Sequence, residues 1–168
     1  RQMIDYISGK ISTVVLLVNP TRDYVHKIIK TLQPSFLQFH GDETPKFCNQ
    51  FDYPYIKAIR VSPDLNIERA VEHFNPKGGF LFDTWHPKKY GGTGGTFDWD
   101  VLPNELKAPK ILAGGLNSTN VGQAIKIARP DVVDVSGGVE SLKGIKDERL
   151  IANFVDSVGS ADMKIDKK

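Results

Sequence analysis

The sequence predicts an α/β fold in which parallel strands alternate with crossover helices. Short runs rich in β-branched or aromatic residues are separated by amphipathic stretches, and they begin near Val14, Phe36, Tyr55, Gly79, Ile111 and Val132. Consecutive runs begin 19 to 32 residues apart, and strand–helix units of this size require parallel strands. The last two runs lead into glycines, in segments 110–116 and 134–140. Six strands fit either an incomplete β/α barrel, whose closed form has eight, or an open doubly wound sheet.

Length and composition indicate one globular domain spanning residues 1–168. The chain is 40% hydrophobic and 25% charged, with a net charge of +2 and no basic block in its body, which argues against a dedicated nucleic-acid surface. Its longest run of Val, Ile and Leu, Val14 to Val18, is too short to cross a membrane. The single cysteine, Cys48, allows no intrachain disulfide and fits a reducing compartment.

The helices at the N-terminal end are predicted from capping residues and apolar spacing. Residues 1–8 read as the end of a helix that Gly9 terminates, with Ile4, Tyr6 and Ile7 on its buried side. Asp23 precedes the next helix, whose apolar positions are Tyr24, Val25, Ile28, Ile29 and Leu32. Thr44 can cap a third helix, with Pro45 at its first position.

Two further helices are expected in the C-terminal half. Asn117 or Ser118 can cap a helix that carries Val121, Ala124, Ile125 and Ala128. Asp147 can start the last helix, with one apolar face formed by Leu150, Ile151, Phe154, Val155 and Val158.

The two glycine-rich strand exits are the first candidate site. Glycines at such exits let the backbone approach a ligand and present its N–H groups to it. A phosphate held between the two loops would contact Gly114, Gly115, Ser136 and Gly137. The alternative is a pair of tight turns that bind nothing.

Asp83 is the candidate acid. It ends the strand 79–83, where alternation places it on the face of Leu81 and opposite Phe80 and Phe82. The loop 84–96 follows, with four glycines among residues 91–95 that could let it close over a ligand. A carboxyl group at the mouth of a barrel, beneath such a loop, suits a general acid. The alternative is an aspartate that only caps a turn.

Other polar residues stand at strand ends. His40 shares a face with Gln38 and is either a ligand contact or a structural histidine. Asp134 is a charge inside an apolar strand, which needs a partner or a substrate. Arg60 reads as a rim charge rather than an anion clamp. The four histidines lack the spacing of metal ligands, so no metal site is expected, and Cys48 reads as a core thiol.

Taken together, five segments resemble phosphoribosylanthranilate isomerase of tryptophan biosynthesis. They follow in the family's order and cover essentially the whole chain: 37–43, 81–83, 90–99, 112–117 and 134–147. The resemblance implies a small (β/α)₈ TIM barrel, of which about six of eight units are present, in the cytoplasm. It also implies an Amadori rearrangement of N-(5-phosphoribosyl)anthranilate to 1-(2-carboxyphenylamino)-1-deoxyribulose 5-phosphate, without cofactor, metal, nucleic acid or membrane. The resemblance implies no particular oligomeric state.

Site roles also follow from the resemblance. Asp83 stands at the position of the family's general acid, and the loops of Gly114, Gly115, Ser136 and Gly137 stand where the family holds the substrate phosphate. His40 and Asp134 are expected to contact the substrate. The family usually has Ser-Ser-Gly where this chain has Ser136-Gly137-Gly138. One hydroxyl is lost but the backbone donors stay, so we expect a modest weakening of phosphate binding at most.

One departure concerns the general base. The family uses a cysteine in a Lys-x-Cys-Gly motif at the end of its first strand, and this sequence has no such motif. We therefore expect that the chain lacks the family's first strand, first helix and second strand, together with an arginine that binds the anthranilate carboxylate, and that it is inactive alone.

Other functions stay open at this point. A neighbouring phosphate-binding barrel such as indole-glycerol-phosphate synthase would need a catalytic lysine at a strand, for which Lys57 is the candidate. A histidine-pathway isomerase or a non-catalytic phosphosugar-binding barrel are the further alternatives.

Overall fold

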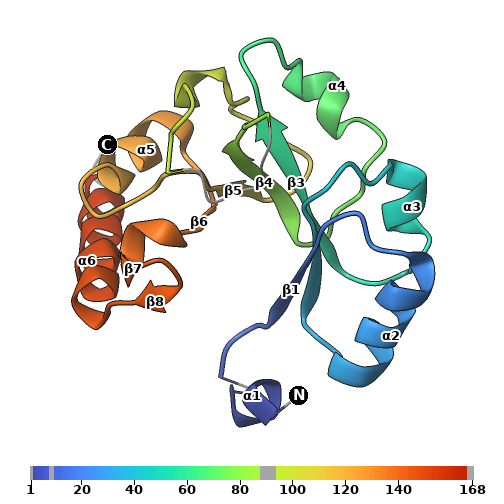
Figure 1. Cartoon of the computed structure of the whole chain (residues 1–168). Helices are drawn as coiled ribbons and strands as arrows, with labels where there is room; N and C mark the ends of the chain where they lie inside the picture. The colour runs from blue at the N-terminus through green and yellow to red at the C-terminus, as the bar shows by residue number, and fades with distance from the viewer. Residues whose placement is uncertain (1, 8–9, 88–93, 166–168) are drawn as a thin grey trace.

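A computed structural model describes residues 2–7, 10–87 and 94–165. Six parallel strands form one curved sheet in sequential order (Figure 1). They are β1 (Val14–Leu17), β2 (Phe36–Phe39), β3 (Tyr55–Val61), β4 (Gly79–Thr84), β5 (Lys110–Leu112) and β6 (Val132–Val133). Every strand predicted from the sequence is therefore confirmed, with starts that agree to within one residue.

Helices cover one face of the sheet. They are α2 (Arg22–Leu32), α3 (Pro45–Asn49), α4 (Ile67–Val71), α5 (Val121–Ala128) and α6 (Glu148–Ile165), while α1 (Gln2–Ile7) precedes β1. Phe80 and Phe82 of β4 pack in one buried cluster with residues of α5 and α6. Leu81, between them in sequence, packs with Ala58 and Ile111 in a cluster that contains no helical residue. The alternation predicted for β4 is confirmed.

This arrangement is that of a barrel rather than of a doubly wound sheet. A doubly wound sheet has helices on both faces and a reversal of strand order, whereas here the strand order is sequential and the inner cluster carries no helix. Among the described residues β1 and β6 have one neighbouring strand each. The described sheet is therefore an incomplete barrel, and Figure 1 shows β1 and β6 at its two ends.

Two helix starts agree with the sequence prediction. The Thr44 hydroxyl accepts a hydrogen bond from the Phe47 amide, and Pro45 opens α3. Asp147 precedes α6, and its carboxylate accepts from the amides of Arg149 and Leu150 at 2.9 and 3.1 Å. Each cap satisfies amides that the first helical turn leaves without a partner.

Two other helix starts were wrong by a few residues. Helix α2 begins at Arg22 with Thr21 as its cap, so Asp23 lies in the first turn rather than before it. Helix α5 begins at Val121, after Asn120. The Asn117 carboxamide oxygen instead accepts from the amide and hydroxyl of Thr119, in a local turn that delays the helix.

Two predicted buried faces are smaller than expected. On α6, Phe154 is buried, whereas Ile151 and Val155 are 41% and 60% exposed, because only the stripe through Leu150, Phe154 and Val158 meets the core. On α1, Tyr6 is 78% exposed rather than buried. Gly9, predicted to end that helix, lies outside the described residues.

The segment after β6 holds structure that the sequence did not predict. It contains the 3₁₀ turn η2 (Gly137–Val139). An antiparallel hairpin of β7 (Glu140–Leu142) and β8 (Ile145–Lys146) follows. The other 3₁₀ turn, η1 (Trp99–Val101), precedes β5. Figure 1 shows this hairpin near β6.

Candidate active site

Asp83 occupies the end of β4 on the inner face of the sheet. Asp83 is 6% exposed, and one of its carboxylate oxygens accepts a hydrogen bond from the Thr84 amide at 2.8 Å. Parallel strands share their carboxyl ends at one edge, so Asp83 lies at the same edge as the exits of β5 and β6. The predicted place of this side chain, at the mouth of the barrel, is confirmed.

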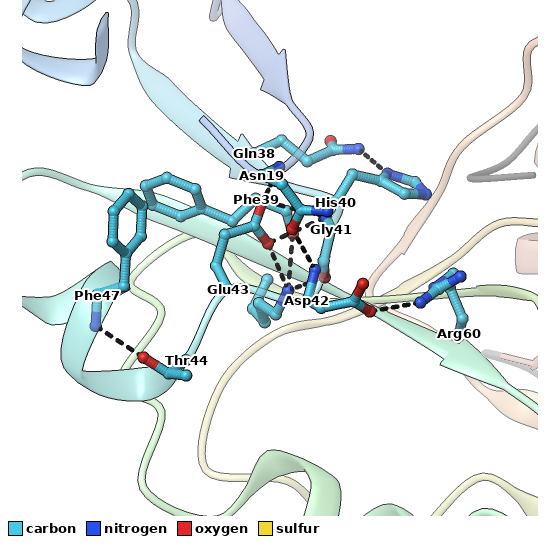
Figure 2. Close-up of polar contacts among 11 residues, drawn as sticks. Asn19, Gln38, Phe39, His40, Gly41, Asp42, Glu43, Thr44, Phe47 and Arg60 are labelled. Carbon is cyan, nitrogen blue, oxygen red and sulfur yellow. Dashed lines mark hydrogen bonds and ion pairs between the residues drawn. The ribbon is translucent and has the colours of Figure 1, made fainter. Parts of the chain in front are cut away.

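A histidine holds the other oxygen of that carboxylate. His40, which follows β2, places Nε2 at 3.1 Å from Oδ2 of Asp83. The Gln38 side-chain nitrogen lies 2.9 Å from Nδ1 of the same ring (Figure 2). When the amide donates to Nδ1, the ring proton of a neutral imidazole sits on Nε2 and points at Asp83. The three buried side chains thus form one chain of hydrogen bonds that ends at the candidate acid.

The two glycine-rich exits lie side by side. Strands β5 and β6 pair directly, with Ile111 opposite Val132. Gly114 has a φ of +84°, and a Cβ there would collide with the Thr84 backbone and crowd the Asp83 carboxylate. Gly138 touches the backbone of Leu116 and Asn117 so closely that a side chain could not fit. Glycine is required at both positions because the exits pack against Asp83 and against each other.

Together these segments enclose one cavity of about 350 Å³. Its described lining contains the candidate acid, both exits and one residue of the loop after β4: Asp83, Gly94, Ala113 to Asn117, Asp134 and Ser136 to Gly138. Thr84 fastens that loop, because its hydroxyl donates to the Gly95 carbonyl at 2.7 Å. Residues 88–93 of the predicted closing loop lie outside the described part of the chain.

Asp134 lines the same cavity but remains exposed on its open side. Partial loss of solvent, followed by repulsion from Asp83, raises the pKa of this carboxyl group above its ordinary value of 3.8. His40 and Lys146 act in the opposite direction. The cost predicted for a charge at this position therefore corresponds to the raised pKa of the Asp134 carboxyl group.

The Asp134→Asn substitution is expected to raise the melting temperature near neutral pH and to change it little in acid. A raised pKa means that the folded chain binds more protons than the unfolded chain above pH 3.8, so stability falls as pH rises through the folded-state value. The amide removes this loss. Thermal unfolding at about pH 3.5 and about pH 7 measures it, with the exposed Asp156→Asn on α6 as control. An equal effect at both pH values contradicts the assignment.

Three other candidates lie away from the cavity. Arg60 pairs with Asp42 at the rim, as expected. Cys48 of α3 is 1% exposed, and burial raises the pKa of its thiol to about 12, so it is a core thiol and no base. Lys57 lies on the opposite face from Ala58, with its ammonium 2.9 Å from Glu43 and bonded to two carbonyls. Lys57 therefore cannot serve as the catalytic lysine that a synthase would need.

Sequence reasoning missed the residues that support the site. Glu43 accepts from the backbone amides of Asn19 and Gly41 while it pairs with Lys57, and this network fixes the loop that carries His40 (Figure 2). A lysine inside the apolar strand 55–61 was the available signal, because a buried ammonium requires a partner. Within the described residues, no cluster of three or more potential metal ligands is found, and no described helix is long and apolar enough to cross a membrane.

Comparison with known proteins places this arrangement in context. A family model described as N-(5'-phosphoribosyl)anthranilate (PRA) isomerase matches residues 3–157. The N-(5'-phosphoribosyl)anthranilate isomerase of Neisseria meningitidis is 46% identical over 145 residues, which are 86% of this chain and 70% of that protein. The protein of the same name from Pseudomonas putida strain W619 is 48% identical over 151 residues, covering 90% and 73% of the two chains.

Solved structures agree in fold. The phosphoribosyl anthranilate isomerase of Thermotoga maritima superposes with a TM-score of 0.81 at 32% identity, over 95% of this chain and 78% of that one. A structure of the same enzyme class in complex with reduced 1-(o-carboxyphenylamino)-1-deoxyribulose 5-phosphate superposes with a TM-score of 0.77 at 28% identity, over 95% and 77%.

Proposed function

We propose that this chain acts in tryptophan biosynthesis by an Amadori rearrangement. It belongs to the N-(5'-phosphoribosyl)anthranilate isomerase family, and this is the reaction of that family. The substrate is N-(5-phosphoribosyl)anthranilate and the product is 1-(2-carboxyphenylamino)-1-deoxyribulose 5-phosphate. The observation that carries the proposal is the single cavity in which the Asp83 carboxyl group meets both glycine exits. An acid and an anion site that line the same cavity suit a sugar phosphate as the ligand.

Asp83 is the proposed general acid. Ring opening requires a proton on the ribose ring oxygen, and Asp83 is the residue that both lines the cavity and is held by His40 and Thr84. Two fixed hydrogen bonds leave the carboxyl group little rotational freedom, so it is aimed before substrate binds. The His40 ring, fixed in turn by the Gln38 amide, helps to keep the carboxyl group in place at the cavity.

The phosphate is proposed to lie between Gly114, Gly115, Ser136 and Gly137. Backbone N–H groups and one hydroxyl suit an anion, and these residues line the cavity beside Asp83. Asp134 is proposed to face the sugar rather than the phosphate, because its carboxyl group lines the cavity and can accept hydrogen bonds from sugar hydroxyls but would repel an anion. Residues 1–168 act as one domain in this proposal. The buried single thiol of Cys48 fits the cytoplasm as its compartment.

Ligand binding tests the proposal directly. The chain is titrated with reduced 1-(o-carboxyphenylamino)-1-deoxyribulose 5-phosphate and with its dephosphorylated form. We expect saturable binding of the first, and at least about tenfold weaker binding of the second, because a phosphate gains several charge-assisted hydrogen bonds. Absence of binding of both compounds contradicts the proposed function.

Turnover separates an enzyme from a phosphosugar-binding barrel. The resemblance places the general base in a Lys-x-Cys-Gly strand, so the assay uses the chain with that strand, and the helix and strand that follow it, joined ahead of Arg1. Product formation supports the isomerase. Tight binding of the phosphorylated ligand without product favours the non-catalytic barrel.

A further inference from the structure

The β7–β8 hairpin returns a lysine to the exit of β6. The Lys146 ammonium donates to the Ser136 carbonyl at 2.8 Å, to the Ser136 hydroxyl at 3.2 Å and to the Glu140 carboxylate at 2.7 Å. An ammonium group has three N–H donors, so each has an acceptor within this segment. Two of the three acceptors belong to Ser136, which lines the candidate phosphate site.

Glu140 keeps this lysine in place. Its second carboxylate oxygen accepts from the Gly144 amide at 2.9 Å, which fastens the turn of the hairpin to the same side chain. Hydrogen bonds from Lys146 and Gly144 are the two largest causes that lower the pKa of Glu140. The carboxylate therefore stays ionised and holds both the turn and the ammonium.

The contact with Lys146 sets the direction of the Ser136 hydroxyl. Because its oxygen accepts a hydrogen bond from the ammonium, its own hydrogen is directed away from Lys146 and is available to a different acceptor. The adjacent space is the cavity that Ser136, Gly137 and Gly114 line. An anion in this cavity would receive a hydrogen bond from an already oriented hydroxyl. It would also be attracted by the positive charge of Lys146, which lies on the other side of that hydroxyl.

We propose that Lys146 is a positioning residue of the phosphate site. This proposal rests on the function proposed above. It acts through Ser136, fixing the hydroxyl as a donor and adding positive charge, and does not itself bind the phosphate because its donors are used. This also accounts for a site with only one hydroxyl: the donor that remains is oriented in advance, which lowers the entropic cost of binding. An ordinary surface ion pair would stabilise the hairpin slightly and leave ligand binding unchanged.

The test compares Lys146→Met with Lys143→Met, an exposed lysine in the same hairpin. The probes are inorganic phosphate, reduced 1-(o-carboxyphenylamino)-1-deoxyribulose 5-phosphate and its dephosphorylated form. We expect Lys146→Met to weaken binding of both phosphate-bearing probes about tenfold, since one oriented hydrogen bond and one charge are lost. Binding of the dephosphorylated form, and every affinity of Lys143→Met, should stay within about twofold of the unmodified chain.

A double substitution separates positioning from a general loss of structure. In a Ser136→Ala background, Lys146→Met should weaken binding by less than about a further threefold, because the hydroxyl is already gone and only the charge of the lysine is then lost. Lys146→Arg should recover part of the affinity. Equal phosphate affinities for Lys146→Met and Lys143→Met overturn the proposal, as does a full tenfold effect that persists without the Ser136 hydroxyl. An unmodified chain that binds inorganic phosphate but not the product analogue contradicts the proposed function instead.

Discussion

Turnover is expected to fall about a thousandfold in the Asp83→Asn variant, while ligand affinity should change by less than about threefold. An amide has the size and shape of a carboxyl group but cannot give a proton to the ribose ring oxygen at neutral pH. Its oxygen can still accept from the Thr84 amide, which Asp83 accepts from at 2.8 Å. Its nitrogen can face the His40 ring if the Gln38 amide turns over, so the hydrogen-bond chain survives.

The measurement pairs kinetics with titration. Turnover is assayed on the chain extended by the family's base-bearing strand, and affinity is measured with reduced 1-(o-carboxyphenylamino)-1-deoxyribulose 5-phosphate. Asp156→Asn, an exposed aspartate on α6, is the matched control and should retain both properties. If Asp83→Asn lost binding together with turnover, the carboxyl group would be structural. Retained turnover would remove it as the acid.

The Lys57→Met variant should lose about 3–5 kcal/mol of unfolding free energy. The ammonium is buried and pairs with Glu43 at 2.9 Å, and it also donates to the Phe39 and Gly41 carbonyls. Methionine fills similar volume but leaves a carboxylate in the interior without its counter-ion. The exposed Lys46→Met on α3 is the control and should change stability by less than about 0.5 kcal/mol.

Urea denaturation measures this loss, and a second substitution identifies its cause. Adding Glu43→Gln removes the unpaired charge while keeping one oxygen, at the place of Oε1, that accepts from the Asn19 and Gly41 amides. The double variant should therefore be more stable than Lys57→Met alone. If the two losses were simply additive, lost packing rather than charge would explain them.

Local sequence signals were sufficient for the strands and for Asp83. Strand starts follow from short apolar runs bounded by turn residues, and alternation alone places Leu81 and Asp83 on the inner face. The adjacency of the Gly114 and Ser136 exits followed from sequential parallel strands. The functional assignment depended on the resemblance, because an aspartate at a strand end is usually a capping residue.

Contacts between distant segments could not be read from the sequence. The pairs His40–Asp83 and Glu43–Lys57 join different strands and loops, and nothing local fixes their distance. Lys146 was not singled out from the sequence, because the hairpin that returns it to Ser136 has only two or three residues per strand. Ile151 and Val155 satisfied the helical period but lie beyond the stripe that meets the core, since periodicity does not say how wide the covered face is.

Cys48 gives this chain a built-in chemical reporter. It is the single cysteine of the sequence, it lies in the buried cluster that joins α2, α3 and β2, and the residue is 1% exposed. A protonated, covered thiol resists alkylation, so labelling proceeds only through molecules in which this part of the chain has opened. The rate of modification by a maleimide or iodoacetamide therefore measures how often α3 and the neighbouring Glu43–Lys57 network open, without an engineered cysteine.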